Sequence, residues 1–142
     1  MKLRNASFIT LRPLFVAVAL AAGAILPPQQ LLAASRPVSI LFAQFGEVTR
    51  SAEARHLNGF SRELRSKADA QGYIIAYGGR DSEPDVAQER ADRAKEYLVT
   101  TRDIDPSRIV TVDGGYKEGP DTELWIVPSG ATPPSASPTV DR

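Results

Sequence analysis

The segment between Gly72 and Gly115 constrains the fold more strongly than any other part of the chain. Residues 73–77 form a short apolar run between glycines, which is typical of a strand buried on both faces. Residues 108–112 form a second short run rich in β-branched residues, and a segment of helical period ending at Leu98 separates the two runs. A strand, a helix and a strand at this spacing predict a βαβ unit with parallel strands and a right-handed crossover.

Regular structure is also predicted on both sides of this unit. Residues 38–45 indicate a first strand, and residues 51–70 carry apolar side chains every three or four positions, as an amphipathic helix does. Residues 122–127 indicate a last strand, antiparallel to its neighbour because no helix-length crossover precedes it. Three residues of the first strand are candidates for the core: Ile40, Phe42 and Phe45.

The helix inside the βαβ unit is expected to begin at a capping box. Ser82 stands at the cap, Pro84 near the first turn and Asp85 three residues after the serine. The inward stripe that follows is apolar except for one long charged residue, Arg90. We interpret this arginine either as a ligand-binding residue or as a helix-edge residue whose stem covers apolar surface while its head reaches solvent or an acid.

A pair of glycines closes each strand of the unit, at residues 78–79 and 114–115. We interpret both pairs as turns that need a positive φ. A phosphate-binding loop is not indicated, because the lysine of a P-loop and the spaced glycines of a dinucleotide fingerprint are both absent.

Together these elements predict an α+β fold in the order βαβαββ. Two helices on one face of a four-stranded mixed sheet is the simplest architecture that buries both helical stripes. We assign this domain to residues 35–127. Residues 128–142 are rich in Pro, Ser and Thr and are expected to be a disordered tail, because such a composition cannot bury a core.

The first 34 residues have the layout of a secretory signal peptide. Three basic residues precede the apolar run 14–26, which is shorter than the roughly 20 residues needed to cross a bilayer. Small residues allow cleavage after Ala34 or after Ala24, and an uncleaved anchor is the alternative. The chain is therefore expected to be exported to the periplasm or cell envelope, and to contact the membrane only through this segment.

Composition excludes several classes of function. All 17 acidic residues follow residue 34, whereas three of the 17 basic residues precede it, so the remainder has 14 basic residues and a formal charge of −3. A mildly acidic chain does not fit a nucleic-acid-binding face. There is no cysteine, and the single histidine, His56, is expected on a solvated helix face. No metal cluster, cofactor motif or nucleophile–base–orienter set can be assembled, so an enzyme is not expected.

Several residues in and after the second predicted helix form a recognisable pattern: Arg90-Ala91, Tyr97-Leu98, Ile104 and Arg108-Ile109. In this pattern the chain resembles the C-terminal domains of the OmpA/MotB family. The likeness covers residues 73–127 in sequence and residues 38–72 in predicted architecture only. The chain also resembles uncharacterised secreted bacterial proteins that share its Tyr-Gly-Gly, Arg-Ala-x-Arg-Ala and Val-Asp-Gly-Gly-Tyr segments.

The resemblance implies a ligand. Members of the family hold the diaminopimelate of peptidoglycan with an Asp after the second strand and an Arg on the second helix. Arg90 falls on that Arg, whereas the Asp falls at Gly79, or at Asp81 if the turn shifts. Arg90 would then bind the carboxylate of the ligand and Asp81 its ammonium group. On this reading the protein is a non-enzymatic, exported cell-envelope module that binds peptidoglycan weakly.

The alternative is a structural or protein-interaction domain of the same fold that has lost the peptidoglycan site. Such a domain would contact an envelope protein through its last strand or its tail. Trp125 lies in that strand between Leu124 and Ile126. An exposed Trp125 would mark a partner surface, whereas burial, full or partial, is the expectation that we favour.

Overall fold

The computed structural model describes residues 35–141, so the expected signal peptide lies outside the described residues. The described elements are β1 (Ile40–Phe45), α1 (Arg50–Ser66), β2 (Gln71–Gly78), α2 (Val86–Thr100), the 3₁₀ helix η1 (Pro106–Arg108), β3 (Ile109–Tyr116) and β4 (Asp121–Val127). Within these residues one four-stranded sheet has the order β1-β4-β2-β3. Strands β2 and β3 are parallel, and β4 is antiparallel to both β1 and β2. The predicted βαβαββ order and mixed sheet are confirmed.

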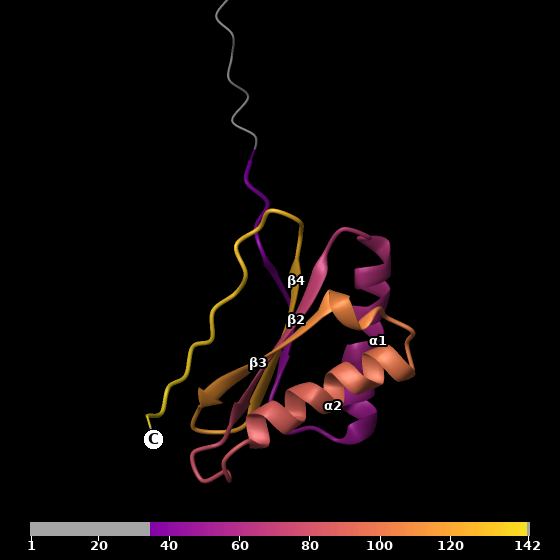
Figure 1. The fold of residues 1–142 in the computed structure, drawn as a ribbon. Helices are drawn as coiled ribbons and strands as arrows, with labels where there is room; N and C mark the ends of the chain where they lie inside the picture. The colour runs from indigo at the N-terminus through magenta and orange to yellow at the C-terminus, as the bar shows by residue number, and fades with distance from the viewer. Residues whose placement is uncertain (1–34, 142) are drawn as a thin grey trace, which may run out of the picture. The chain divides into compact units, whose positions relative to one another are not determined.

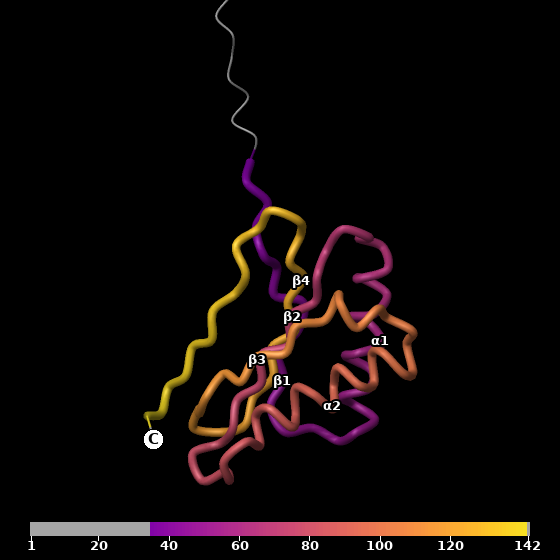
Figure 2. Tube along the Cα trace, in the orientation of Figure 1, coloured from indigo at the N-terminus to yellow at the C-terminus, as the bar shows by residue number. Residues whose placement is uncertain are grey.

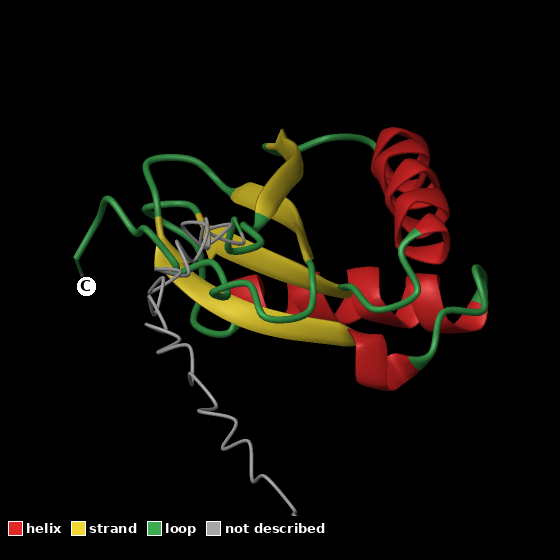
Figure 3. Cartoon of the chain, turned by 90° about the horizontal axis from the view of Figure 1, so that it is seen from above, coloured by secondary structure: helices red, strands yellow, loops and turns green. Residues whose placement is uncertain are grey.

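Helices α1 and α2 both cover the same face of the sheet (Figures 1 and 3). The core lies between them and includes residues from both helices and from all four strands. The Asn58-Gly59 pair in the middle of α1 has a packing reason. A Cβ atom at Gly59 would lie 3.2 Å from the ring of Phe42, and Asn58 accepts a hydrogen bond from the hydroxyl of Tyr97 on α2. The helix keeps this glycine because β1 approaches it closely.

Strand β1 lies at the edge of the sheet. The prediction that Ile40 and Phe42 belong to the core is wrong. Ile40 is 50% exposed and Phe42 is 37% exposed, whereas Phe45 is buried. The pairing of β1 with β4 shifts register between Leu41 and Ala43, as a bulge does. The edge position and the bulge leave the first half of β1 open to solvent, although the ring of Phe42 still packs against Phe60 of α1.

Strand β4 is a central strand, with β1 on one side and β2 on the other. Both of its edges are therefore hydrogen-bonded within the sheet, and it cannot bind a partner by strand addition. A partner could therefore meet β4 only through the face of the sheet, and contact through this strand stays a prediction. Trp125 is half-buried, as expected, and its Nε1 donates a hydrogen bond to Glu123.

The tail after β4 is not disordered in the structure, and that expectation is wrong. It runs along the side of the sheet opposite the helices (Figures 1 and 2). The backbone N–H groups of Thr139 and Val140 donate to the carbonyl oxygen of Tyr116 at the end of β3, and Val140 is buried. Near the middle of the tail, Ser137 N donates to the hydroxyl of Tyr77. Prolines restrict the unbound tail, so less conformational entropy is lost when it packs.

The glycine pairs are only partly explained by positive φ. Gly115 has φ 80°, which confirms the expectation there, whereas Gly78, Gly79 and Gly114 do not have positive φ. At Gly114 the reason is space, because a Cβ atom would lie 2.5 Å from the ring of Tyr77. The interpretation of these three glycines as positive-φ turns is wrong, and close packing explains them instead.

Candidate functional site

Arg90 lines a pocket of about 190 Å³ where the connection between β1 and α1 meets helix α2. The pocket combines two apolar residues from the end of β1 and the following turn with charged residues from both helices. Its lining consists of Phe45, Glu47, Val48, Arg50, Glu53, Arg90 and Arg93. The sequence therefore predicted one residue of this pocket from its exceptional place on an apolar helix face.

Local helix geometry brings the charged residues together. Arg90 and Arg93 lie three residues apart on α2, and Arg50 and Glu53 lie three residues apart in the first turn of α1, so each pair shares one helix face. Helix α1 begins here because the side chain of Thr49 accepts a hydrogen bond from Ala52 N. The packing of α1 beside α2 then places both pairs on one pocket.

The floor of the pocket is held by an aromatic contact. Phe45 is buried, and its ring stacks on that of His56 with centroids 4.5 Å apart and an interplanar angle of 9°. His56 is half-buried by this contact, so its expected place on a solvated face is wrong. Its role in the structure is to support the end of β1.

The charges of the pocket favour an anion. Three guanidinium groups and two carboxylates line it, and Glu53 already contacts Arg93 at 3.9 Å. The Nε atom of Arg90 is buried, yet no described protein atom accepts a hydrogen bond from it. A buried donor without an acceptor is costly, and a carboxylate is the acceptor that a guanidinium binds best.

Asp81 is not among the residues that line this pocket. It is exposed in the connection between β2 and α2, where the hydroxyl of Ser82 accepts a hydrogen bond from Gly79 N and closes a turn. Ser82 therefore does not cap α2, and the predicted capping box is wrong, because the cap residue is Asp85 with φ 67°. The structure does not bring Asp81 and Arg90 together in one described pocket.

The neighbour of Asp81 ties this connection to the β3–β4 hairpin instead. Arg80 Nε donates to Glu118 at 3.0 Å, and Arg80 N donates to the carbonyl oxygen of the same residue at 3.4 Å. The hydrogen bond from Arg80 lowers the pKa of the Glu118 carboxyl, and Glu118 in turn raises the pKa of Arg80. Both side chains are well exposed, so this pair contributes little to stability.

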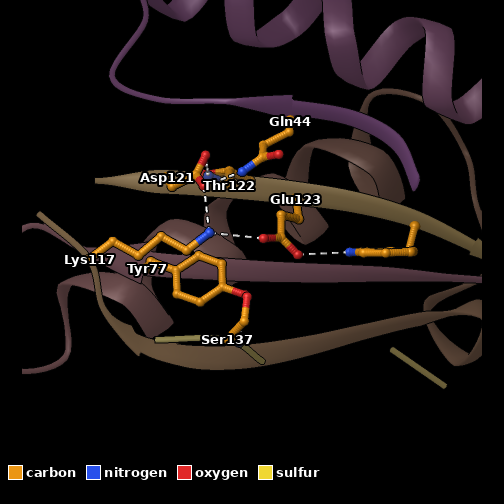
Figure 4. Close-up of polar contacts among 8 residues, drawn as sticks. Gln44, Tyr77, Lys117, Asp121, Thr122, Glu123 and Ser137 are labelled. Carbon is orange, nitrogen blue, oxygen red and sulfur yellow. Dashed lines mark hydrogen bonds and ion pairs between the residues drawn. The ribbon is translucent and has the colours of Figure 1, made fainter. Parts of the chain in front are cut away.

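A second polar cluster, the Lys117 network, lies on the helix-free face of the sheet (Figure 4). Lys117 Nζ is 2.7 Å from Asp121 and 2.9 Å from Glu123, and it stands 3.7 Å above the ring of Tyr77. Four further hydrogen bonds complete the network. They join Gln44 and Thr122 N to Asp121, Trp125 to Glu123, and Ser137 N to Tyr77.

The charges of the Lys117 network stabilise one another and shift two pKa values. Burial works against the charge of Lys117, but the hydrogen bonds and charges of Asp121 and Glu123 outweigh it and raise the pKa of the lysine. Burial likewise works against ionised Asp121, but the hydrogen bonds from Lys117 and Gln44 outweigh it and lower the pKa of the aspartate. Because every charge has partners, we interpret this network as structural rather than as a ligand site.

The Lys117 network could not be predicted from the sequence. Alternation along β4 places Asp121, Glu123 and Trp125 on one face of the sheet, and this much can be predicted from the sequence. Nothing local showed that Lys117 from the preceding loop and Tyr77 from β2 would meet them. Arg108 belongs to the sequence pattern shared with the OmpA/MotB family. Its role in this structure is to donate hydrogen bonds to three backbone carbonyl oxygens at and after the end of α1.

Within residues 35–141, two further features of functional regions are absent. No group of three His, Asp or Glu side chains in this part of the chain could hold a metal ion. None of the helices in this part of the chain has the length and hydropathy of a membrane-spanning segment.

Known proteins do not decide among these interpretations. No protein-family model matches the chain, and no curated protein is significantly similar to it. The resemblance to the OmpA/MotB family therefore stays a prediction that rests on the residues given above.

Proposed function

We propose that this protein is a non-enzymatic, exported cell-envelope module that binds peptidoglycan through the pocket around Arg90. Two observations support the proposal: the buried Nε atom of Arg90 has no acceptor among the described residues, and Arg90 lines a pocket together with two further arginines. The guanidinium groups of this pocket fit the free carboxylate of a diaminopimelate residue.

The same pocket offers a partner for the ammonium group of such a ligand. Glu47 and Glu53 both line it, whereas Asp81 does not. We therefore assign the ammonium-binding role to these glutamates in place of Asp81. The distance between the carboxylate of Glu53 and the guanidinium of Arg93 is 3.9 Å, which is close to the upper limit for an ion pair. Glu53 can therefore turn toward a ligand at small cost in free energy.

Co-sedimentation with purified peptidoglycan tests this proposal. The protein from Ser35 onward is expected to pellet with peptidoglycan, and Arg90→Ala is expected to weaken binding about tenfold or more, because it removes a charged hydrogen bond. Arg62→Ala is the matched control, since Arg62 is an exposed arginine that lines none of the described pockets. Asp81→Asn is expected to bind like the parent protein.

Two results would overturn the proposal. A folded parent protein that stays in the supernatant at every peptidoglycan concentration does not bind this polymer. Equal losses of binding in Arg90→Ala and Arg62→Ala would show non-specific attraction to an anionic surface rather than a site.

A second candidate function is protein binding through β1. Within residues 35–141, the large apolar side chains that are exposed gather at and beside this edge strand: Val38, Ile40, Leu41, Phe42 and Val48. Exposed apolar side chains on an edge strand are typical of a surface that meets another protein. Retention of the folded protein by an envelope extract but not by peptidoglycan, and its loss in Leu41→Lys, would favour this function.

A further inference from the structure

A second pocket lies beside the Arg90 pocket, in the groove between α1 and α2. Its volume is about 250 Å³, and six residues line it: Arg50, Glu53, Ala54, Leu57, Arg93 and Tyr97. Three of these residues, Arg50, Glu53 and Arg93, also line the Arg90 pocket. The two pockets are therefore neighbours on either side of the contact between Arg93 and Glu53.

The lining of this groove differs from that of the Arg90 pocket. The residues that belong to the groove alone are Ala54, Leu57 and Tyr97, and they offer mainly carbon. The hydroxyl of Tyr97 is already engaged, because it donates to Asn58 at 2.9 Å. What Tyr97 presents to a ligand is therefore its ring, and the groove has an apolar end and a charged end.

Size also links the two pockets. Neither reaches roughly 300 Å³, the lower limit of typical small-molecule sites. A ligand that extends from one pocket into the other would use both, with its charged group beside Arg90 and its apolar part beside Leu57. The guanidinium groups that the two pockets share would lie along such a ligand and favour its negative end.

We infer that the groove between α1 and α2 is an apolar subsite for the chain attached to the charged group held by Arg90. The ligand class is thus a zwitterionic amino-acid group carrying an unbranched aliphatic chain, rather than a small amino acid such as glycine or alanine. This inference rests on the proposed function, because it assumes that the Arg90 pocket holds the zwitterion.

A chain-length series of amino acids tests this inference. Glycine, norvaline, norleucine and meso-diaminopimelate would be titrated into the protein from Ser35 onward, and binding would be followed by NMR. The described residues of this protein lie within one compact unit. Affinity is expected to rise from glycine to norleucine by about two- to fourfold for each added methylene, as burial of hydrocarbon requires. Glycine should then bind the most weakly of the four.

A variant with a larger side chain in the groove between α1 and α2 provides a comparison with the parent protein. Ala54→Leu is expected to remove the gain in affinity that comes with chain length, because the larger side chain fills the groove. Ala68→Leu is the control, because Ala68 is exposed and lines none of the described pockets. The series in the parent protein needs no variant, so the test holds even if Ala54→Leu does not fold.

The possible failures are distinguishable. If none of the four amino acids binds, both the inference and its basis in the Arg90 pocket are wrong. If all four bind with equal affinity, or if Ala54→Leu keeps the full gain from chain length, the Arg90 pocket stands and the apolar subsite is refuted.

Discussion

Two cationic side chains of this protein, Lys117 and Arg90, lie in opposite electrostatic situations. Lys117 has two carboxylates within 2.9 Å and an aromatic ring beneath it. The Nε atom of Arg90 is buried, and no described residue accepts a hydrogen bond from it. Removing a fully partnered charge leaves its partners unpaired, whereas removing a charge that lacks partners costs the fold little. The two residues should therefore respond differently to substitution.

Lys117→Met is expected to lower the free energy of unfolding by about 2–3 kcal/mol, because it leaves the half-buried Asp121 and the buried Glu123 without their cation. Urea unfolding followed by the fluorescence of Trp125 measures this. Lys67→Met is the control, since Lys67 forms a more exposed ion pair with Glu63 and should cost less than about 0.5 kcal/mol. Equal effects of the two substitutions would contradict the role given to the Lys117 network.

The contribution of the Lys117 network to stability also depends on pH. Asp121 has a lowered pKa, so its contribution is present above roughly pH 4 and is lost as pH falls through the lowered value. Lys117 has a raised pKa, so its contribution is present below roughly pH 10.5 and is lost only as pH rises through the raised value. The difference between parent and Lys117→Met should accordingly be constant at neutral pH and shrink in acid.

Among the helices and strands, sequence periodicity predicted those features that depend on interactions between residues close together in the chain. The βαβ unit and both helical stripes follow from sequence periodicity, and the structure confirms them. Contacts between distant segments were not predictable in this way. Gly114 is required by the ring of Tyr77 on the neighbouring strand, and Ile40 is exposed because β1 lies at an edge. Arg90 could be found because a charge on an apolar helix face is itself a local signal.

The tail is the element on which sequence and structure differ most. Its removal after Gly130 is expected to lower the free energy of unfolding by about 1–2 kcal/mol. The cause is loss of the buried Val140 side chain and of the hydrogen bonds to Tyr77 and Tyr116, offset by the entropy that the tail regains. Thermal unfolding of the two proteins, each starting at Ser35, measures the difference.

Limited proteolysis gives a second readout of the packed tail. Cleavage between Ala131 and Val140 should be slow in the folded protein and rapid once Tyr77→Phe removes the hydroxyl that Ser137 contacts. Rapid cleavage in the parent protein, together with an unchanged unfolding temperature after truncation, would return the tail to the disordered state that its composition indicates.

At the scale of the whole molecule, the two faces of the sheet have separate roles. The helices cover one face and form the Arg90 pocket at one end of their packing, whereas the tail and the Lys117 network lie on the other face (Figures 1 and 4). The first face carries the proposed ligand site and the second stabilises the domain. Binding and stability should therefore be separable by mutation.

NMR titration of the ¹⁵N-labelled protein with meso-diaminopimelate tests whether the Arg90 pocket is the ligand site. The Nε–H signal of Arg90 and the backbone signals of residues 45–53 and 90–93 are expected to shift together, while those of Asp81 and Lys117 stay in place. Shifts confined to Asp81, or none in the Arg90 pocket at saturating ligand, would contradict the account.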